Sequence, residues 1–182
     1  KNKIIYSPIK YKIINFITVG QLNYQKDHNF LLDTLRKINL PKGYKISLDI
    51  FGLGIEENNL NEKITNLGLI ENVKLMGWSD KPWNTKNYVG HLLTSRWEGY
   101  PNVVLEAASY SIPTLSIPIP PCTTDIIKDN YIGLVSFKRK HEDYAKLIEL
   151  YIHNLIKNYN YDFKFKSFID KHNPLLLMNV LS

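Results

Sequence analysis

The chain has a single cysteine, Cys122, among its 182 residues, so no disulfide can form within it. It also lacks any apolar run of about 20 residues, the length that a membrane-spanning helix needs. Arginine is scarce, because 20 of the 23 basic residues are lysine. The composition of the chain, with 44% hydrophobic and 22% charged residues, is typical of a globular domain with a sizeable core.

The net charge of +6 lies within residues 1–50, which hold nine basic and three acidic residues, whereas residues 51–182 hold 14 of each. A basic excess suggests nucleic acid or an acidic membrane surface as a binding partner. Base recognition favours the bidentate arginine fork, and the sequence has no helix-turn-helix, zinc-finger or RNP pattern. We therefore expect no nucleic-acid partner, and peripheral contact of the basic segment with an anionic membrane stays open.

Short apolar runs alternate with amphipathic stretches, a pattern typical of βα units around a parallel sheet. Six strands are predicted, at residues 13–19, 46–51, 73–76, 89–95, 113–117 and 133–136. Helices are predicted at residues 27–38, 56–67, 101–110, 123–128, 142–157 and 163–181. The result is a doubly wound α/β domain, in which ligands bind beyond the carboxyl ends of the strands. The loops expected to form a site are 20–26, 52–54, 77–83, 95–102 and 118–124.

Two glutamates, Glu98 and Glu106, lie eight positions apart and flank a predicted helix start at Pro101. The first-turn amides of that helix have no partner within it and attract phosphate. Phosphate repels a carboxylate, so the glutamates are better suited to hydroxyl groups. Glu106 lies about 7–8 Å along the helix from Pro101. A molecule with a central diphosphate and a diol at each end fits this spacing, and a sugar nucleotide is such a molecule.

Five segments carry a resemblance to a known family, in order and in spacing: VGQLNYQK (19–26), FGLG (51–54), VKLMGW (73–78), SRWEGYPNVVLEA (95–107) and DIIKDNYIGLV (125–135). The fourth segment contains a Glu-x7-Glu motif. Together they resemble the carboxyl-terminal, donor-binding half of GT-B glycosyltransferases of the retaining family 4 type, glycosyl transferases group 1. The resemblance covers about residues 4–155. It implies a Rossmann-like doubly wound parallel sheet, one half of a GT-B fold.

The resemblance also implies roles for individual residues. Glu98 would be the catalytic residue that holds the transferred sugar, Glu106 would bind the ribose hydroxyls, and Lys26 would neutralise the diphosphate. The other donor-binding residues implied are Gly20, Gln21, Gly52, Gly54, Met76, Gly77, Gly99, Tyr100, Pro101, Asn102 and Val103. Members of this fold need no metal, so we expect no metal and no cofactor. The five scattered histidines are expected at the surface.

The sequence departs from the family pattern at three places. Gln21 stands where the family has an arginine, which removes one of two cations at the diphosphate at a net loss of about 1 kcal/mol. Pro121 to Asp125 replaces a Gly-Gly-x-x-Glu loop. Asn130 replaces a turn glycine, which is tolerable because asparagine visits the left-handed region.

The resemblance divides the chain and implies a missing part. Residues 1–12 would be an interdomain linker strand, 13–160 the donor-binding domain, and 161–182 a C-terminal helical tail that exposes Phe163, Phe165 and Phe168. The N-terminal, acceptor-binding domain would precede residue 1. We expect a cytoplasmic protein that moves a hexosyl or related sugar from a nucleotide-sugar to an envelope polysaccharide or glycolipid. The fragment alone is expected to bind the nucleotide and to transfer little or nothing.

Alternative interpretations fit some of these residues. Glu98 and Glu106 could be capping or surface carboxylates, Lys26 a solvated lysine, and Trp78 and Trp83 either stacking or packing residues. At the level of function, a non-catalytic nucleotide-sugar-binding module of the same fold is the main alternative. An epimerase of this fold should lack the Glu-x7-Glu motif, and a phosphorylase should carry a lysine for its cofactor. A dehydrogenase is disfavoured because residues 52–54 lack the third glycine of the dinucleotide fingerprint.

Overall fold

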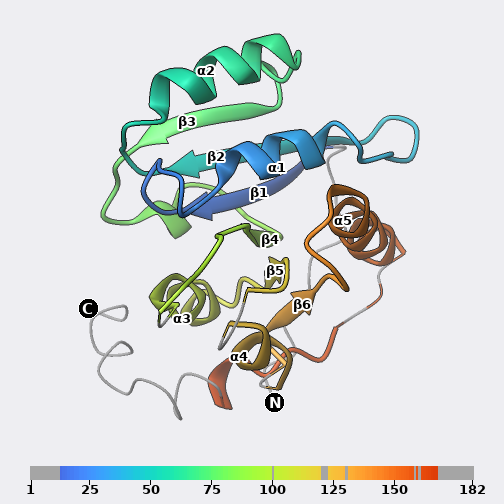
Figure 1. Ribbon diagram of the computed structural model, residues 1–182. Coiled ribbons are helices and arrows are strands. Elements are labelled where there is room, and N and C mark those ends of the chain that lie inside the picture. The colour runs from blue at the N-terminus through green and yellow to red at the C-terminus, as the bar shows by residue number, and fades with distance from the viewer. Residues whose placement is uncertain are drawn as a thin grey trace.

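Six parallel strands form one sheet in the order β3-β2-β1-β4-β5-β6 (Figure 1). This computed structural model describes residues 13–99, 101–119, 123–129, 131–157, 159 and 161–167. The strands are β1 (Ile13–Val19), β2 (Lys45–Phe51), β3 (Val73–Gly77), β4 (Gly90–Leu93), β5 (Thr114–Ser116) and β6 (Gly133–Val135). The prediction of a doubly wound, Rossmann-like parallel sheet is confirmed.

The strand order reverses between β1 and β4, which are neighbours in the sheet although two strands separate them in sequence. The chain first moves outward from β1 to β3 and then returns to build β4, β5 and β6 on the other side. Ligands of doubly wound sheets bind at such a switch point, beyond the carboxyl ends of the strands. The loops that follow β1 and β4 are therefore the ones to examine for a site.

The helices are α1 (His28–Leu35), α2 (Glu57–Asn66), α3 (Asn102–Ser109), α4 (Thr123–Asp129) and α5 (His141–Ile156). Each coincides with a predicted helix to within a few residues. A short 3-10 turn, η1 (Pro82–Asn84), was not predicted, and it lies in the connection between β3 and β4. The predicted strand 89–95 is shorter in the structure, where β4 ends at Leu93. The hydroxyl of the next residue, Thr94, donates to the backbone carbonyls of Lys26 and Asp27.

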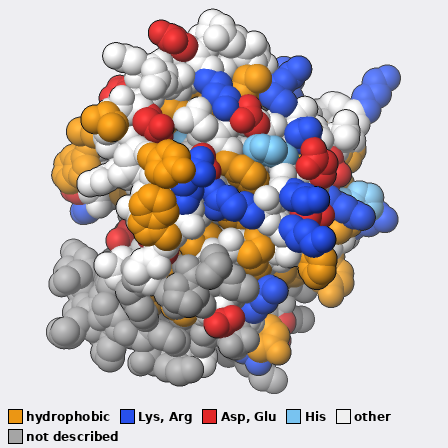
Figure 2. All heavy atoms as spheres, viewed as in Figure 1, with side chains coloured by type: hydrophobic (Ala, Val, Ile, Leu, Met, Phe, Trp, Pro, Cys, Tyr) orange, Lys and Arg blue, Asp and Glu red, His pale blue; other side chains and the backbone are white. Residues whose placement is uncertain are grey.

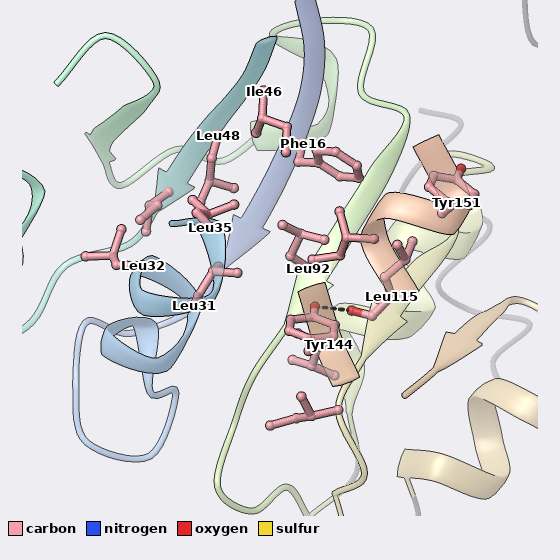
Figure 3. Close-up of a cluster of buried hydrophobic side chains, with 14 of the residues drawn as sticks. Phe16, Leu31, Leu32, Leu35, Ile46, Leu48, Leu92, Leu115, Tyr144 and Tyr151 are labelled. Atoms are coloured by element: carbon pink, nitrogen blue, oxygen red, sulfur yellow. Dashed lines mark hydrogen bonds between the residues drawn. The ribbon is translucent and has the colours of Figure 1, made fainter. Parts of the chain in front are cut away.

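The main core packs all five helices against the sheet, and Figure 3 shows the part of it that lies beside α1 and α5. Phe16 of β1 and Leu48 of β2 face this core, and Tyr144 and Tyr151 of α5 are fully buried against it. The Tyr144 hydroxyl donates to the carbonyl of Leu115 at 2.7 Å, so this buried polar group is satisfied.

A second cluster of buried side chains is separate from that core and consists of Ile17, Phe51, Trp83, Tyr88, Ala107 and Ile112. These residues come from β1, β2, α3, the connection that contains η1 and, in the case of Ile112, the connection between α3 and β5. Because both faces of the sheet are buried, the strand sequences are nearly continuous apolar runs and do not alternate between apolar and polar residues.

The start of the predicted C-terminal tail differs from expectation. Phe165 is buried and Phe163 packs against the main core, so neither forms the exposed apolar surface that was predicted. Only residues 165–167 are helical among those described in this stretch. Phe168 and the rest of the tail, the linker at 1–12, Tyr100 and Cys122 lie outside the described residues.

Basic and acidic side chains intermix on the face shown in Figure 2, where lysines and arginines stand beside aspartates and glutamates. Ion pairs join Lys37 to Glu142 and Lys63 to Asp33. No helix among the described residues is long and apolar enough to cross a membrane.

Candidate functional site

Lys26 and Glu98 meet at the switch point of the sheet. Lys26 lies in the loop after β1 and Glu98 in the loop after β4, 72 positions apart in sequence, with 2.7 Å between the lysine Nζ and the glutamate Oε1. The Ser95 hydroxyl donates to the same oxygen at 2.5 Å. The side chains are only 19% and 7% exposed, so the solvated-lysine and surface-carboxylate interpretations of these two residues are wrong.

The two loops are also joined through their backbones. The amide of Arg96 donates to the carbonyl of Gln25 at 2.7 Å, and the Gln25 side-chain amide donates to the carbonyl of Trp97 at 3.0 Å. The aliphatic stem of Lys26 lies over Gly20, where a Cβ atom would be 3.1 Å from two of its carbons. Lys26 and Glu98 are therefore held by a connected framework rather than by their own contact alone.

Asp27, beside Lys26, is the centre of a charged cluster. Its backbone is left-handed, with φ of 49°, and its carboxylate caps α1 by accepting from the amide of Phe30 at 3.3 Å. The same carboxylate pairs with Arg96 at 3.0 Å and with Arg139 at 2.6 Å. Arg139 also donates to the carbonyls of Thr94 and Ser95, so it ties the loop that carries Glu98 to the start of α1.

The glycines predicted to contact the donor converge at the same edge. A Cβ atom at Gly52 would lie 1.9 Å from the carbonyl oxygen of Gly20, and one at Gly54 would lie 2.2 Å from that of Leu22. The amide of Gly52 donates to the carbonyl of Gly77 at 2.8 Å. The loops after β1, β2 and β3 are thus in backbone contact. At Gly52 and Gly54 this contact is possible only because glycine has no side chain.

Glu106 lies in α3 and is partly buried. Burial raises the pKa of its carboxyl group, while the Trp83 indole N–H, 3.3 Å from Oε2, and the positive charge of Lys26 act in the opposite direction. Trp83 is 5% exposed, which confirms packing for this residue. Trp78 is exposed, so its proposed stacking on a base or sugar stays a prediction.

The remaining predicted residues surround this edge. Pro101 is buried and directly precedes α3, and Asn102 and Val103 form its first turn. Gln21 is exposed, and its side-chain carbonyl accepts from Asn23 at 3.0 Å. Met76 is half-exposed at the end of β3. Gly99 follows Glu98 in the same loop.

Two histidines overturn the expectation of a surface position. His28 and His91 are buried, and burial together with the charge of Lys26 lowers the pKa of His28 to about 4 and that of His91 to about 3. Both are therefore neutral at pH 7. His91 shares a hydrogen bond of 3.1 Å with Thr114, and its ring meets that of Trp83 edge-on. Within the described ranges, no three His, Cys, Asp or Glu side chains cluster closely enough to hold a metal ion.

Sequence reasoning missed several contributors to this site: Ser95, Asp27, Arg139 and the bond from Trp83 to Glu106. Ser95 lies three residues before Glu98 in the same motif, so its proximity was available from the sequence. Arg139 is one of only three arginines, and its use in a chain rich in lysine was a signal of a side chain that makes several hydrogen bonds.

The fold and the site together define a class of protein. A doubly wound parallel sheet, with a lysine, two glutamates and close-packed glycine loops at its switch point, is the architecture of a Rossmann-like half of a GT-B glycosyltransferase. The chain belongs to the glycosyl transferases group 1, whose family model matches residues 7–164.

Curated relatives are longer than this chain. The lipopolysaccharide 1,6-galactosyltransferase of Salmonella typhimurium is 32% identical over 140 residues, which is 73% of this chain and 38% of that protein. The amylovoran biosynthesis glycosyltransferase of Erwinia amylovora is 34% identical over 115 residues, which is 63% of this chain and 32% of that protein. The chain thus spans about a third of the length of these two relatives.

Solved structures share the fold. The lipopolysaccharide outer core galactosyltransferase WaaB, in its apo form, superimposes with a TM-score of 0.72 and 26% identity over 93% of this chain and 51% of that chain. Anabaena HepE, solved with UDP and glucose, gives a TM-score of 0.75 at 17% identity over 93% of this chain and 47% of that chain. At that lower identity the likeness establishes the fold alone.

Proposed function

We propose that this chain is the donor-binding domain of a retaining glycosyltransferase that moves a hexosyl or related sugar from a nucleotide-sugar to an envelope polysaccharide or glycolipid. The observation that carries the proposal is the contact between Lys26 and Glu98. The contact brings a cation and a carboxylate together at the edge where doubly wound sheets bind ligands, which supports roles toward a diphosphate and a sugar hydroxyl.

The chemistry asked of each residue follows from its charge and surroundings. Transfer breaks the bond between the anomeric carbon and the diphosphate oxygen, forms a bond from that carbon to the acceptor oxygen, and passes the proton of the acceptor hydroxyl to the released diphosphate. Negative charge grows on the leaving diphosphate, and Lys26, together with the first-turn amides of α3, would stabilise it. Glu98 would accept hydrogen bonds from the sugar, and Glu106 from the ribose. No metal is assigned a part in this proposal.

The acceptor is inferred from the relatives. The Salmonella relative is named for lipopolysaccharide and the Erwinia relative for amylovoran, and both names denote bacterial glycans. Because the chain spans about a third of such proteins, the acceptor site is proposed to come from a further domain. We accordingly expect this fragment to bind the donor without turning it over, and equal turnover by fragment and whole protein would contradict that. The cytoplasmic location stays a prediction.

A nucleotide-sugar-binding module without catalysis is the second candidate, and Gln21 is the observation that favours it. The residue replaces an expected cation, and its side-chain carbonyl is already bonded to Asn23. Hydrolysis or transfer of the donor by the whole protein would exclude this candidate.

The direct test is a calorimetric titration of the fragment with UDP-, GDP- and ADP-sugars, repeated with Glu106→Ala. We expect one base to be preferred and the variant to bind at least tenfold more weakly, since a hydrogen bond to a charged group is worth about 1.5–3 kcal/mol. Glu142→Ala is the matched control, because Glu142 lies far along the chain in an exposed pair with Lys37. If no donor binds while circular dichroism shows an intact fold, the site assignment is wrong.

A further inference from the structure

The connection between β3 and β4 lies against the second buried cluster and brings Trp83 to Glu106. Trp83 follows Pro82 in the η1 turn, and its indole packs edge-on to His91 and parallel to Tyr110, with ring centroids 5.4 and 6.4 Å away. Its N–H is the hydrogen-bond donor recorded for the Glu106 carboxylate within the described part of the chain. The Trp83 ring is thus held by two aromatic contacts, and its N–H donates to one oxygen of the Glu106 carboxylate.

The other end of the same connection is anchored by Asp49. This aspartate of β2 is fully buried, and its carboxylate accepts from the Tyr88 hydroxyl at 2.7 Å and pairs with Lys86 at 2.7 Å. The Tyr88 hydroxyl also bonds Thr85 at 2.6 Å, one step closer to Trp83. A buried carboxylate without partners is strongly unfavourable, so residues 85–88 must stay where they satisfy it.

The bond from Trp83 has two consequences for Glu106. It restrains the carboxylate through Oε2, while Oε1 has no hydrogen-bond partner among the described residues and can accept from a ligand. It also opposes the effect of burial on the pKa of Glu106. An ionised carboxylate is an acceptor only and can receive both hydroxyls of a vicinal diol, whereas a protonated one must donate at one oxygen.

We propose that Trp83 is a positioning residue that orients Glu106 for the vicinal hydroxyls of a ribonucleoside diphosphate, and that Asp49 fixes Trp83 through Lys86 and Tyr88. This inference rests on the proposed function, which assigns the ribose to Glu106. It adds to the site Trp83, Lys86 and Tyr88 of the β3–β4 connection and the buried Asp49 of β2. None of the four is assigned a contact with the ligand.

The test compares ribonucleotides with their 2′-deoxy counterparts. Titrations use UDP, GDP and ADP and the 2′-deoxy form of whichever binds, with Trp83→Phe, which keeps a packed ring and removes the donor. We expect about a fivefold to tenfold loss of affinity for the ribonucleotide and less than about a twofold change for the deoxynucleotide. Asp49→Asn, which keeps the shape and removes the charge, is expected to reduce the ribonucleotide preference by about threefold.

A double-variant cycle separates positioning from general loss of structure. In a Glu106→Gln background, Trp83→Phe is expected to have no further effect, because its only route to the ligand has been altered already. Tyr144→Phe is the control, since it removes a buried hydrogen bond from the other core and is expected to leave both affinities unchanged. Equal losses for both nucleotides, or a loss that persists with Gln at 106, would overturn the inference.

Failure of the inference and failure of the proposed function give different results. If wild-type protein binds none of the three diphosphates, or if Glu106→Gln leaves the preference for ribose unchanged, the assignment of Glu106 to the ribose is wrong. If Glu106→Gln abolishes the preference and Trp83→Phe does not, only the positioning role is wrong.

Discussion

Removing the charge of Lys26 is expected to destabilise this protein far more than removing the charge of a lysine in an exposed pair of the same length. Lys63 and Asp33 form that reference pair, also 2.7 Å apart, with side chains 26% and 39% exposed. The Lys26 and Glu98 side chains are 19% and 7% exposed. Distance is thus matched and the carboxylates differ in burial, while Lys63 also donates to the carbonyl of Asn29 at 3.2 Å, a bond that works against the expected difference.

The magnitude follows from the carboxylate left behind. Lys26→Met leaves Glu98 buried, with the Ser95 hydroxyl as its remaining side-chain partner among those described. Breaking a buried pair in this way costs about 3–5 kcal/mol of unfolding free energy. Lys63→Met leaves a carboxylate that water reaches, so about 0.2–1 kcal/mol is expected.

Urea denaturation of both single variants, of Glu98→Gln and Asp33→Asn, and of the two double variants provides the measurement. The double-variant cycle is expected to give a larger coupling free energy for the Lys26 pair than for the Lys63 pair. Equal destabilisation by Lys26→Met and Lys63→Met, within about 0.5 kcal/mol, would refute the view that Lys26 and Glu98 form a desolvated pair.

Two further predictions concern the glycine loops and the buried histidines. Gly52→Ala is expected to cost about 3 kcal/mol or more, because its Cβ would meet the Gly20 carbonyl, whereas Gly68→Ala, left-handed but in open space, is expected to cost about 1–2 kcal/mol in the same denaturation assay. Similar losses for both would contradict the close approach of the loops. The pKa values of His28 and His91 are lowered to about 4 and about 3, so the unfolded chain binds protons that the native state does not, and stability is lost as pH falls from about 6.5 toward those values. Urea midpoints measured between pH 7.5 and 5 are expected to decline over that range, and a flat profile would show that these rings ionise normally.

The elements were predictable wherever a local pattern decides them. The run at 13–19 is apolar and ends at Gly20, and β1 has those bounds in the structure. Gly68 ends α2 with a φ of +66°, as the C-terminal glycine pattern predicts. The doubly wound α/β arrangement was predictable as well, because alternating strands and helices can close in few other ways, whereas the strand order comes from the structure.

The contacts that make the site were not predictable in the same way. The bond between Lys26 and Glu98 joins positions 72 apart, and nothing local distinguishes a paired lysine from a solvated one. Surface positions were expected for His28 and His91 because the histidines are scattered along the sequence, yet a neutral imidazole can be buried in a strand or at a helix start. For Trp83 the sequence allows both stacking on a ligand and packing, since only the tertiary structure shows which carboxylate its N–H reaches.

The central claim, that the edge formed by Lys26, Glu98 and Glu106 binds the diphosphate of a nucleotide, is tested most directly by comparing a nucleoside diphosphate with its monophosphate. Calorimetric titration of wild-type protein is expected to favour the diphosphate by at least about tenfold, and Lys26→Met to remove that preference. Lys63→Met, which alters the exposed reference pair, is expected to leave it unchanged. Equal affinity for the two nucleotides in the wild-type protein, or a preference that survives in Lys26→Met, would contradict the account.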